Sequence, residues 1–410
     1  MMTNKIVVAY SGGLDTSVMV KWLAEHYNAE IITYTAMLGQ EIDTDALRAK
    51  ALQTGASQVI IDDLTDEFIA DYIFPSLKAG ALYEGKYPLA TALGRPLIAK
   101  KLVEVARQED AQIIAHGCTG KGNDQVRLEL AIKSLAPDLQ VLAPLRSWEF
   151  KSREQEIEYA IQHNIPITSY LAPLYSVDEN IWGVSVECGA LEDPGLEPPA
   201  DAYQKTASID NSPDDPEQIQ VDFVGGQPVS LNSVISDPKE LIESLNASGA
   251  AHGIGRIDMI ENRVVGIKSR EIYESPAALI LHKLHAELES MVLDKQTLRY
   301  KQAVADQIAN LIYDGFWFGP LNQSLLAFVE HSQQQVTGRV KAKLYKGNVI
   351  ITSRESDYSL YQEKLATYSH DDQFRHDAAA GFIELYGLEQ KVIAQKKQKQ
   401  REENSYVMGS

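Results

Sequence analysis

The chain has 410 residues and carries 38 Lys and Arg against 57 Asp and Glu, which gives a formal net charge of −19 at pH 7. Proteins bind nucleic acids largely by neutralising phosphates, so this charge argues against a nucleic-acid partner and against an anionic membrane surface. No apolar run approaches the ~20 residues that span a bilayer. With two cysteines the chain has neither a disulfide framework nor a zinc site, which indicates a reducing, cytoplasmic location.

The first 168 residues alternate between two kinds of segment. Short β-branched or apolar runs predict buried strands, and longer runs with helical spacing predict helices. The expected strands are 6–9, 30–37, 58–61, 111–116 and 139–142. The expected helices are 15–27, 43–54, 152–163 and 96–108, the last with Pro96 in its first turn. This alternation predicts an α/β domain with a parallel sheet, whose ligands bind beyond the carboxyl ends of the strands.

The pattern changes after about residue 170, where Pro, Gly and acidic residues interrupt it. A loop is expected at 208–218. Further strands are expected at 219–224, 263–268, 337–344 and 348–351, and helices at 277–293 and 301–313. This mixture predicts a second domain of the α+β class.

The C-terminal stretch 377–400 has helical spacing. Its apolar residues at helical spacing form a stripe made of Ala378, Phe382, Ile383, Tyr386 and Leu388. An amphipathic helix with nothing of its own to cover is suited to docking. The pattern leaves open whether it docks on another subunit or on its own chain.

Residues 9–17, Ala-Tyr-Ser-Gly-Gly-Leu-Asp-Thr-Ser, connect the first expected strand to the first expected helix. The two glycines let the backbone turn tightly and approach a ligand, and the helix start offers free N–H groups. Three hydroxyl side chains add donors, so the segment predicts a polyphosphate-binding loop. It is neither a Walker A loop nor a dinucleotide fingerprint. The alternative is an ordinary turn with a capped helix.

Three more clusters, 116–127, 175–187 and 252–274, are polar and punctuated by glycine. The first follows an expected strand and can present amides and a guanidinium to a carboxylate ligand, or it can be a polar surface turn. The other two are too polar for a core but indicate no chemistry alone. We interpret His282 and His285 as a packed or solvated helix face rather than a metal pair, and Cys118 as a small filler.

The nonapeptide at 9–17 resembles the pyrophosphate loop of N-type ATP pyrophosphatases, which cleave ATP between the α and β phosphates. The four clusters, in this order and spacing, resemble argininosuccinate synthases nearly end to end. The resemblance extends to the segments 86–88, 95–100, 191–194 and 359–368. It implies an adenine nucleotide α-hydrolase-like ATP-binding domain at 1–168, a synthetase domain at 169–365, and a C-terminal oligomerisation helix and tail at 366–410 in a homotetramer.

The resemblance also implies an activity: an ATP-dependent C–N ligase of arginine biosynthesis that joins L-citrulline to L-aspartate. The ureido oxygen of citrulline would attack the α-phosphorus to give a citrullyl-adenylate and diphosphate. The amine of aspartate would then displace AMP and form argininosuccinate. Mg²⁺ would enter with ATP, not on protein ligands alone, and would neutralise the departing diphosphate.

Carried over position by position, the resemblance implies three sets of binding residues. ATP is expected to contact Ala9, Tyr10, Ser11, Gly12, Gly13, Leu14, Asp15, Thr16, Ser17, Ala36 and Gly117. Aspartate is expected to contact Thr91, Thr119, Asn123 and Asp124. Citrulline is expected to contact Tyr87, Asn123, Arg127, Ser176, Ser185, Glu261 and Tyr273. Asp15, Asp124 and Arg127 are the expected catalytic residues, with Asp124 facing the amine of aspartate and Arg127 pairing with the carboxylate of citrulline.

Three positions depart from the family pattern: Val184 stands where Arg is usual, Ala92 lacks a hydroxyl, and Met37 replaces a polar residue. None of these removes an expected ligand contact. Two alternatives stay open, a paralogous AMP-forming ligase acting on a citrulline relative and a non-catalytic ATP-binding protein. Other pyrophosphate-loop enzymes fit less well, because tRNA-modifying types need a basic surface and glutamine-dependent types need a nucleophilic cysteine.

Overall fold

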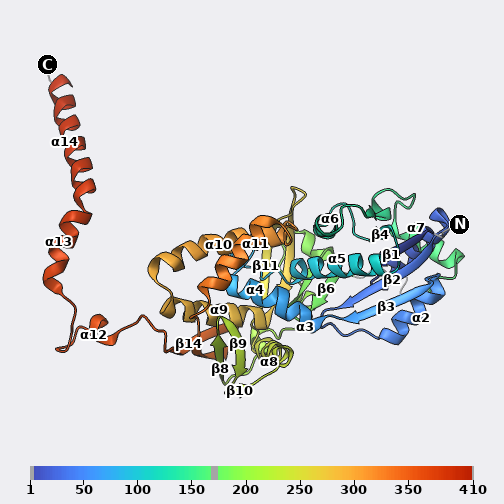
Figure 1. Ribbon diagram of the computed structural model, residues 1–410, viewed down its shortest axis with the longest axis horizontal. Coiled ribbons are helices and arrows are strands. Elements are labelled where there is room, and N and C mark those ends of the chain that lie inside the picture. Colours follow the sequence, from blue (N-terminus) through green and yellow to red (C-terminus); the bar gives the residue numbers. More distant parts are fainter. Residues whose placement is uncertain (1–3, 168–173, 409–410) are drawn as a thin grey trace. The chain divides into compact units, whose positions relative to one another are not determined.

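The computed structural model describes residues 4–167 and 174–408, so the domain boundary expected at 168 and 169 lies outside the described residues. The chain divides into two compact units, Met1–Tyr358 and Ser359–Ser410, each described here by itself (Figure 1).

The N-terminal part of the first unit is built on a five-stranded parallel sheet with the strand order β3-β2-β1-β4-β5. Its strands are β1 (Lys5–Ala9), β2 (Glu30–Met37), β3 (Gln58–Asp63), β4 (Ile113–Ala115) and β5 (Gln140–Leu142). Its helices are α1 (Leu14–Tyr27), α2 (Thr44–Thr54), α3 (Thr65–Phe68), a π-turn (Ile69–Ile73), α4 (Phe74–Ala79), α5 (Ala90–Gln108), α6 (Asp124–Leu135) and α7 (Arg153–Gln162). The predicted α/β class and parallel sheet are confirmed.

Side chains of β1 alternate between the two faces of this sheet, as the period of two in a strand requires. Ile6 and Val8 pack in one cluster with residues of α1, α2 and α7. Val7 packs in the opposite cluster with residues of α5 and α6. Helices therefore cover both faces, which explains why β1 is apolar from Ile6 to Ala9.

The strand order contains a switch point between β1 and β4. From β1 the chain moves outward through β2 to β3, and it then returns to β4 on the other side of β1. The loops that follow β1 and β4 consequently run in opposite directions and leave a crevice between them, where ligands bind in folds of this kind.

The rest of the first unit contains two antiparallel sheets, ordered β11-β12-β7-β6 and β10-β9-β8-β13-β14. The strands are β6 (Ser176–Asn180), β7 (Gly183–Glu187), β8 (Glu217–Val224), β9 (Gln227–Leu231), β10 (Val234–Ile235), β11 (Arg256–Asn262), β12 (Lys268–Glu274), β13 (Gly338–Tyr345) and β14 (Asn348–Glu355). The helices are α8 (Pro238–Ala251), α9 (Pro276–Val292), α10 (Lys295–Tyr313) and α11 (Pro320–Ser332). The predicted α+β part is confirmed.

One hydrophobic core joins the two parts of this unit. Residues of α4 and α5 pack with residues of α9 and α10 and with Trp182, which is fully buried between β6 and β7. Trp182 Nε1 donates to the carbonyl oxygen of Pro88 (3.0 Å), and Asn180 Nδ2 donates to that of Ala90 (2.8 Å). These contacts hold the β6–β7 hairpin against the start of α5, above the carboxyl edge of the parallel sheet.

Two expectations in the first unit are wrong, and the helix expected at 301–313 is longer, because α10 begins at Lys295. The segment 263–268 is not a strand but the turn between β11 and β12, because Gly266 adopts φ +88° and its N–H donates to the carbonyl oxygen of Arg263 (2.9 Å). The helix expected at 96–108 begins at Ala90, so Pro96 lies inside α5 and not in its first turn. A proline there removes one intrahelical hydrogen bond, which tertiary packing on both sides of α5 offsets.

The second unit contains α12 (Glu363–Ala366), α13 (His376–Tyr386) and α14 (Leu388–Met408). The single helix expected at 377–400 is therefore two helices that meet at Gly387, the weakest helix former after proline. Phe382 and Tyr386 stack with ring centroids 5.1 Å apart and are largely exposed. Among the described residues, no helix is long and apolar enough to cross a membrane.

Candidate active site

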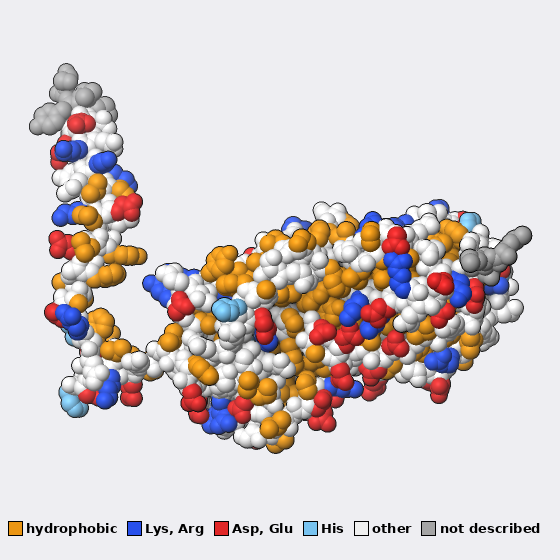
Figure 2. All heavy atoms as spheres, viewed as in Figure 1, with side chains coloured by type: hydrophobic (Ala, Val, Ile, Leu, Met, Phe, Trp, Pro, Cys, Tyr) orange, Lys and Arg blue, Asp and Glu red, His pale blue; other side chains and the backbone are white. Residues whose placement is uncertain are grey.

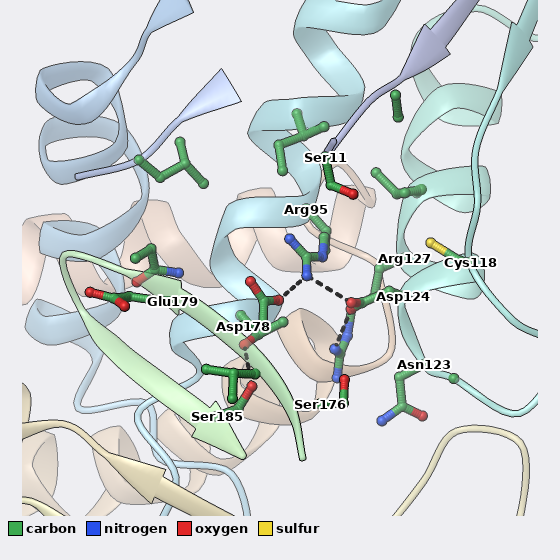
Figure 3. A pocket seen from close by; sticks show the side chains of 18 of the residues that line it. Ser11, Arg95, Cys118, Asn123, Asp124, Arg127, Ser176, Asp178, Glu179 and Ser185 are labelled. Atoms are coloured by element: carbon green, nitrogen blue, oxygen red, sulfur yellow. Dashed lines mark hydrogen bonds and ion pairs between the residues drawn. The ribbon is translucent and has the colours of Figure 1, made fainter. Parts of the chain in front are cut away.

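A cavity of about 710 Å³ opens at the carboxyl ends of β1, β2 and β4. Its floor is formed by the loops after these strands and by α5 and α6. Its opposite wall is formed by β6, β7, β11 and β12. Figure 3 shows Arg95 of α5, Asp124 of α6 and Asp178 of β6 pointing toward one another across the cavity.

The loop between β1 and α1 is shaped by its glycines and is held by hydrogen bonds to their carbonyl oxygens. Gly12 adopts φ +77°, which a residue with a side chain rarely does. Lys50 Nζ of α2 donates to the carbonyl oxygen of Gly12 (2.6 Å), and Ser17 Oγ donates to that of Gly13 (2.7 Å). No side chain caps α1. Its first-turn N–H groups thus remain available. This geometry supports the expected anion-binding loop and not the alternative, an ordinary turn with a capped helix.

Behind this loop, Asp15 faces Glu156 of α7. Burial and the Asp15 carboxylate raise the pKa of Glu156 to about 8, and Arg153 only partly opposes them. Glu156 is therefore protonated at neutral pH. This proton removes one negative charge from the space beside an anion-binding loop.

The centre of the cavity holds a chain of ion pairs drawn in Figure 3. Asp124, the first residue of α6, accepts from Arg127 Nη1 at Oδ1 (2.8 Å) and from Arg95 Nη2 at Oδ2 (2.8 Å). Arg95 Nη2 also contacts Asp178 of β6. Burial by itself would raise the pKa of Asp124, but the two guanidinium groups outweigh it and hold the pKa at about 2. Burial raises the pKa of Asp178 despite its contact with Arg95.

Tyr87, Tyr273, Tyr313 and Glu261 form a group at one side of the cavity, called the aromatic box below. Tyr87 stacks on Tyr273 with ring centroids 3.7 Å apart. Glu261 accepts from the hydroxyls of Tyr273 (2.6 Å) and Tyr313 (2.5 Å). Burial raises the pKa of Glu261, and the two hydroxyl donors only partly oppose this rise. A buried carboxylate between aromatic rings is a strong acceptor for an ammonium group, because little water competes there.

Asn123 and Arg127 are held by protein partners and keep one donor each for a ligand. Asn123 Nδ2 donates to Tyr313 Oη (2.8 Å), and Val264 N donates to Asn123 Oδ1 (2.9 Å). Arg127 Nε donates to the carbonyl oxygen of Tyr313 (2.8 Å). Within residues 4–167 and 174–408, Arg127 Nη2 and the second N–H of the Asn123 amide have no protein acceptor. They form a donor pair suited to a carboxylate.

Family models match nearly the whole chain, the "Arginosuccinate synthase N-terminal HUP domain" over residues 5–166 and the "Arginosuccinate synthase C-terminal domain" over residues 175–393. The chain belongs to the argininosuccinate synthase family. An argininosuccinate synthase of Chlorobium chlorochromatii is 58% identical over 395 residues, 96% of this chain and 99% of that protein. One of Chlorobium phaeobacteroides (strain DSM 266) is 56% identical over the same coverage. The resemblance inferred from the motifs is confirmed.

The cavity brings together most residues expected from argininosuccinate synthases. Of the ATP set, those lining it are Ala9, Tyr10, Ser11, Thr16, Ala36 and Gly117. Gly12 and Gly13 of the loop do not line it, and neither do Leu14, Asp15 and Ser17, which belong to α1. Of the aspartate set, Thr91, Asn123 and Asp124 line it and Thr119 does not. The complete citrulline set lines it, namely Tyr87, Asn123, Arg127, Ser176, Ser185, Glu261 and Tyr273.

Seven charged residues of this cavity were not assigned to the site from the sequence: Glu41, Arg95, Asp178, Glu179, Glu187, Arg263 and Glu271. Arg263 bridges Glu187 and Glu271, and burial together with the Glu187 charge raises the pKa of Glu271 to about 8. The alternation of side chains along β6 and β7 could have indicated two of these residues. It places Asp178 on the same face of the sheet as Ser176, and Glu187 on the same face as Ser185. That signal was missed because no strands were expected there.

The three departures from the argininosuccinate synthase pattern lie outside the main cavity. Val184 is buried on β7 and lines a separate cavity of about 330 Å³. Its cross-strand neighbours are Glu179 and Glu274, and Lys205 Nζ lies 2.6 Å from Glu179. A cation is therefore present beside Val184 although the usual arginine is absent. Ala92 is fully buried and Met37 is half-buried.

Proposed function

We propose that this chain joins L-citrulline to L-aspartate in an ATP-dependent ligation that releases AMP and diphosphate and supplies arginine biosynthesis. The observation that carries the proposal is the single 710 Å³ cavity, which is lined by residues expected for all three substrates. The sequence identity to named argininosuccinate synthases supports the same reaction.

The phosphate groups of ATP would bind the loop at 9–17, with Ala36 and Gly117 flanking the nucleotide. The loop supplies amides and hydroxyls, and the described residues contain no group of three His, Cys, Asp or Glu side chains placed to hold a metal ion. This donor set fits Mg²⁺ that enters on the phosphates of ATP. Bound there, Mg²⁺ stabilises the negative charge of the departing diphosphate.

Citrulline would bind in the aromatic box. Its carboxylate would accept from Arg127 Nη2 and the free N–H of Asn123, and its ammonium would donate to Glu261. Ser176 and Ser185 would lie along its ureido end. Because these donors are already oriented by protein partners, little ordering cost remains when citrulline binds.

Aspartate would bind on the side of Thr91, Thr119 and Asn123, with its ammonium toward Asp124. The ureido oxygen of citrulline would first attack the α-phosphorus, and the freed amine of aspartate would then attack the adenylated carbon. Adenylation turns a poor leaving group into a good one. Holding three substrates in one cavity supplies much of the remaining rate acceleration through proximity.

We also propose a cytoplasmic homotetramer with the domains 1–168, 169–365 and 366–410. Both cysteines are free, which fits a reducing compartment. The exposed apolar side chains of α13 fit burial against another subunit, because an isolated helix with such a face gains stability only from packing.

The test is diphosphate release by the purified chain with Mg-ATP, citrulline and aspartate, leaving out each substrate in turn. We expect release to require citrulline, and argininosuccinate to form only when aspartate is added. ATP binding without release under any combination would favour a non-catalytic ATP-binding protein. Release with a citrulline relative but not with citrulline would favour a paralogous ligase.

A further inference from the structure

Asp178 lies where the expected citrulline and aspartate positions meet. It shares one face of β6 with Ser176, two residues earlier, and it pairs across the ladder with Ser185 of β7. It also shares the Nη2 atom of Arg95 with Asp124, so the two carboxylates are adjacent. Figure 3 shows Arg95 lying between these two carboxylates.

The two carboxylates differ in what they can still accept. Both oxygens of Asp124 are occupied by guanidinium groups, those of Arg95 and Arg127. Asp178 contacts Arg95 through Oδ2 only, and its Oδ1 has no protein donor in the part of the chain that the structure describes. The Asp178 side chain is 35% exposed and lines the cavity. One lone-pair-bearing oxygen therefore faces the space where the substrates would meet.

Protonating Asp124 would break two charge-assisted hydrogen bonds and leave Arg127 and Arg95 short of a counter-charge. A buried cation that loses its partner is costly. Protonating Asp178 at Oδ1 leaves every contact of Arg95 with Asp124 in place, and burial already favours its neutral form. The proton is thus taken up more easily by Asp178 than by Asp124.

We propose that Asp178 is the base that removes the proton from the ammonium of the aspartate substrate, while the adjacent Asp124 stays ionised and attracts that ammonium. This inference rests on the proposed function. The ammonium gives one proton to Asp178, and the nitrogen lone pair forms the C–N bond to the adenylated carbon. The C–O bond to AMP breaks with its electron pair on the AMP oxygen. The attacking nitrogen passes its second proton to the leaving phosphate, and the product is a guanidinium.

The test compares Asp178→Asn with the parent enzyme in separate half-reactions. We expect citrulline-dependent diphosphate release in a single turnover to fall by less than about 5-fold, and argininosuccinate formation to fall at least roughly 100-fold, the usual scale for losing a general base. The matched control is Asp222→Asn, because Asp222 also pairs with an arginine on a strand but lies outside the cavity. It should change neither step.

Hydroxylamine distinguishes loss of a base from loss of structure, because its nitrogen is already unprotonated at neutral pH. It would attack the same adenylated carbon without needing Asp178. We expect the Asp178→Asn enzyme to transfer the citrulline carbon to hydroxylamine at a rate within about 5-fold of the parent.

Three results would overturn the proposal: argininosuccinate formed at the parent rate by Asp178→Asn, equal loss in both half-reactions, or no transfer to hydroxylamine. Failure of the proposed function would show itself differently, because the parent enzyme would then release no diphosphate with citrulline.

Discussion

At the scale of single residues, the carboxyl groups in and beside the cavity have different pKa values because their surroundings differ. Arg95 and Arg127 keep the pKa of Asp124 at about 2, so this side chain is a fixed anion at every working pH. Burial and a neighbouring carboxylate raise the pKa of both Glu156 and Glu271 to about 8. A site that handles a polyanion benefits from such neutral carboxyl groups, because each removes a repulsive charge near neutral pH.

Glu156 provides a pH-dependent prediction. Below pH 8 Glu156 is neutral, and above it the carboxylate ionises beside Asp15, behind the phosphate loop. The added negative charge opposes a bound triphosphate, so we expect the KM for ATP to rise several-fold between pH 7 and 9. In Glu156→Gln this rise should be absent. Initial rates at saturating citrulline and aspartate measure it.

The control for this prediction is Glu154→Gln, an exposed carboxyl on the same helix. It should keep the parental dependence of the ATP KM on pH. A rise of the same size in Glu156→Gln as in the parent would show that another group is responsible.

At the scale of elements, the β6–β7 hairpin carries Ser176, Asp178 and Ser185 into the cavity. Its position depends on close contact with the end of β12. A Cβ added at Gly183 would overlap Ser275 Oγ and lie 3.0 Å from the carbonyl oxygen of Glu274. Only glycine lets β7 approach this backbone so closely, and the substrate-facing side chains take their positions from that approach.

We therefore predict that Gly183→Ala lowers the free energy of unfolding by about 1–3 kcal/mol, the usual cost of overpacking. It should also raise the KM for citrulline more than that for ATP, because β7 borders the side of the cavity where we propose that citrulline binds. Urea denaturation and initial rates measure the two effects.

Gly381→Ala is the matched control, since a Cβ at this position in α13 meets nothing within 4 Å. It should be neutral or slightly stabilising, because alanine is the better helix former. Equal effects of the two substitutions on citrulline binding would contradict the packing argument.

At the scale of the whole molecule, the 710 Å³ cavity exists because one core joins the parallel sheet to the antiparallel part. Phe74 of α4, Leu281 of α9 and Ile308 of α10 belong to the same buried cluster as Trp182. Figure 2 shows acidic side chains spread over the visible face of the first unit, as the net charge of −19 requires.

The second unit leads to a prediction about assembly. Phe382 is 63% exposed and Tyr386 is 79% exposed, although both are aromatic. If subunits cover this face, Phe382→Glu combined with Tyr386→Glu buries two charges and should convert the full-length oligomer into a smaller species. Light scattering after size exclusion, at about 10 μM protein, measures the mass.

Glu384→Gln, on the same helix, should leave the mass of the oligomer unchanged. An unchanged mass in the double variant as well would mean that this face docks on its own chain or stays in solvent.

Local sequence patterns were enough to predict the helices and strands whose own residues show a clear apolar periodicity. The strands at β1 and β2 and the helix α9 were predicted within two residues, because their apolar periodicity is uninterrupted. The hairpin β6–β7 was missed, because the charged residues Asp178 and Glu187, which line the cavity, interrupt the apolar pattern by which strands were predicted. The strand expected at 263–268 failed because Gly266 supplies a turn that its apolar neighbours conceal.

The sequence by itself determined the family, and it predicted a phosphate loop and fewer than half of the residues that line the cavity. Such signals are local, because glycines and hydroxyls at fixed spacing act within a few residues of one another. Only the tertiary structure decided which charged side chains of the cavity form ion pairs with one another. Arg95, Asp124 and Asp178 come from α5, α6 and β6. Their electrostatic interactions depend on how these elements pack, and Arg95 and Asp178 are more than 80 residues apart in the sequence. Acid–base roles arise from that packing, since a pKa is set by distance and burial rather than by position along the chain.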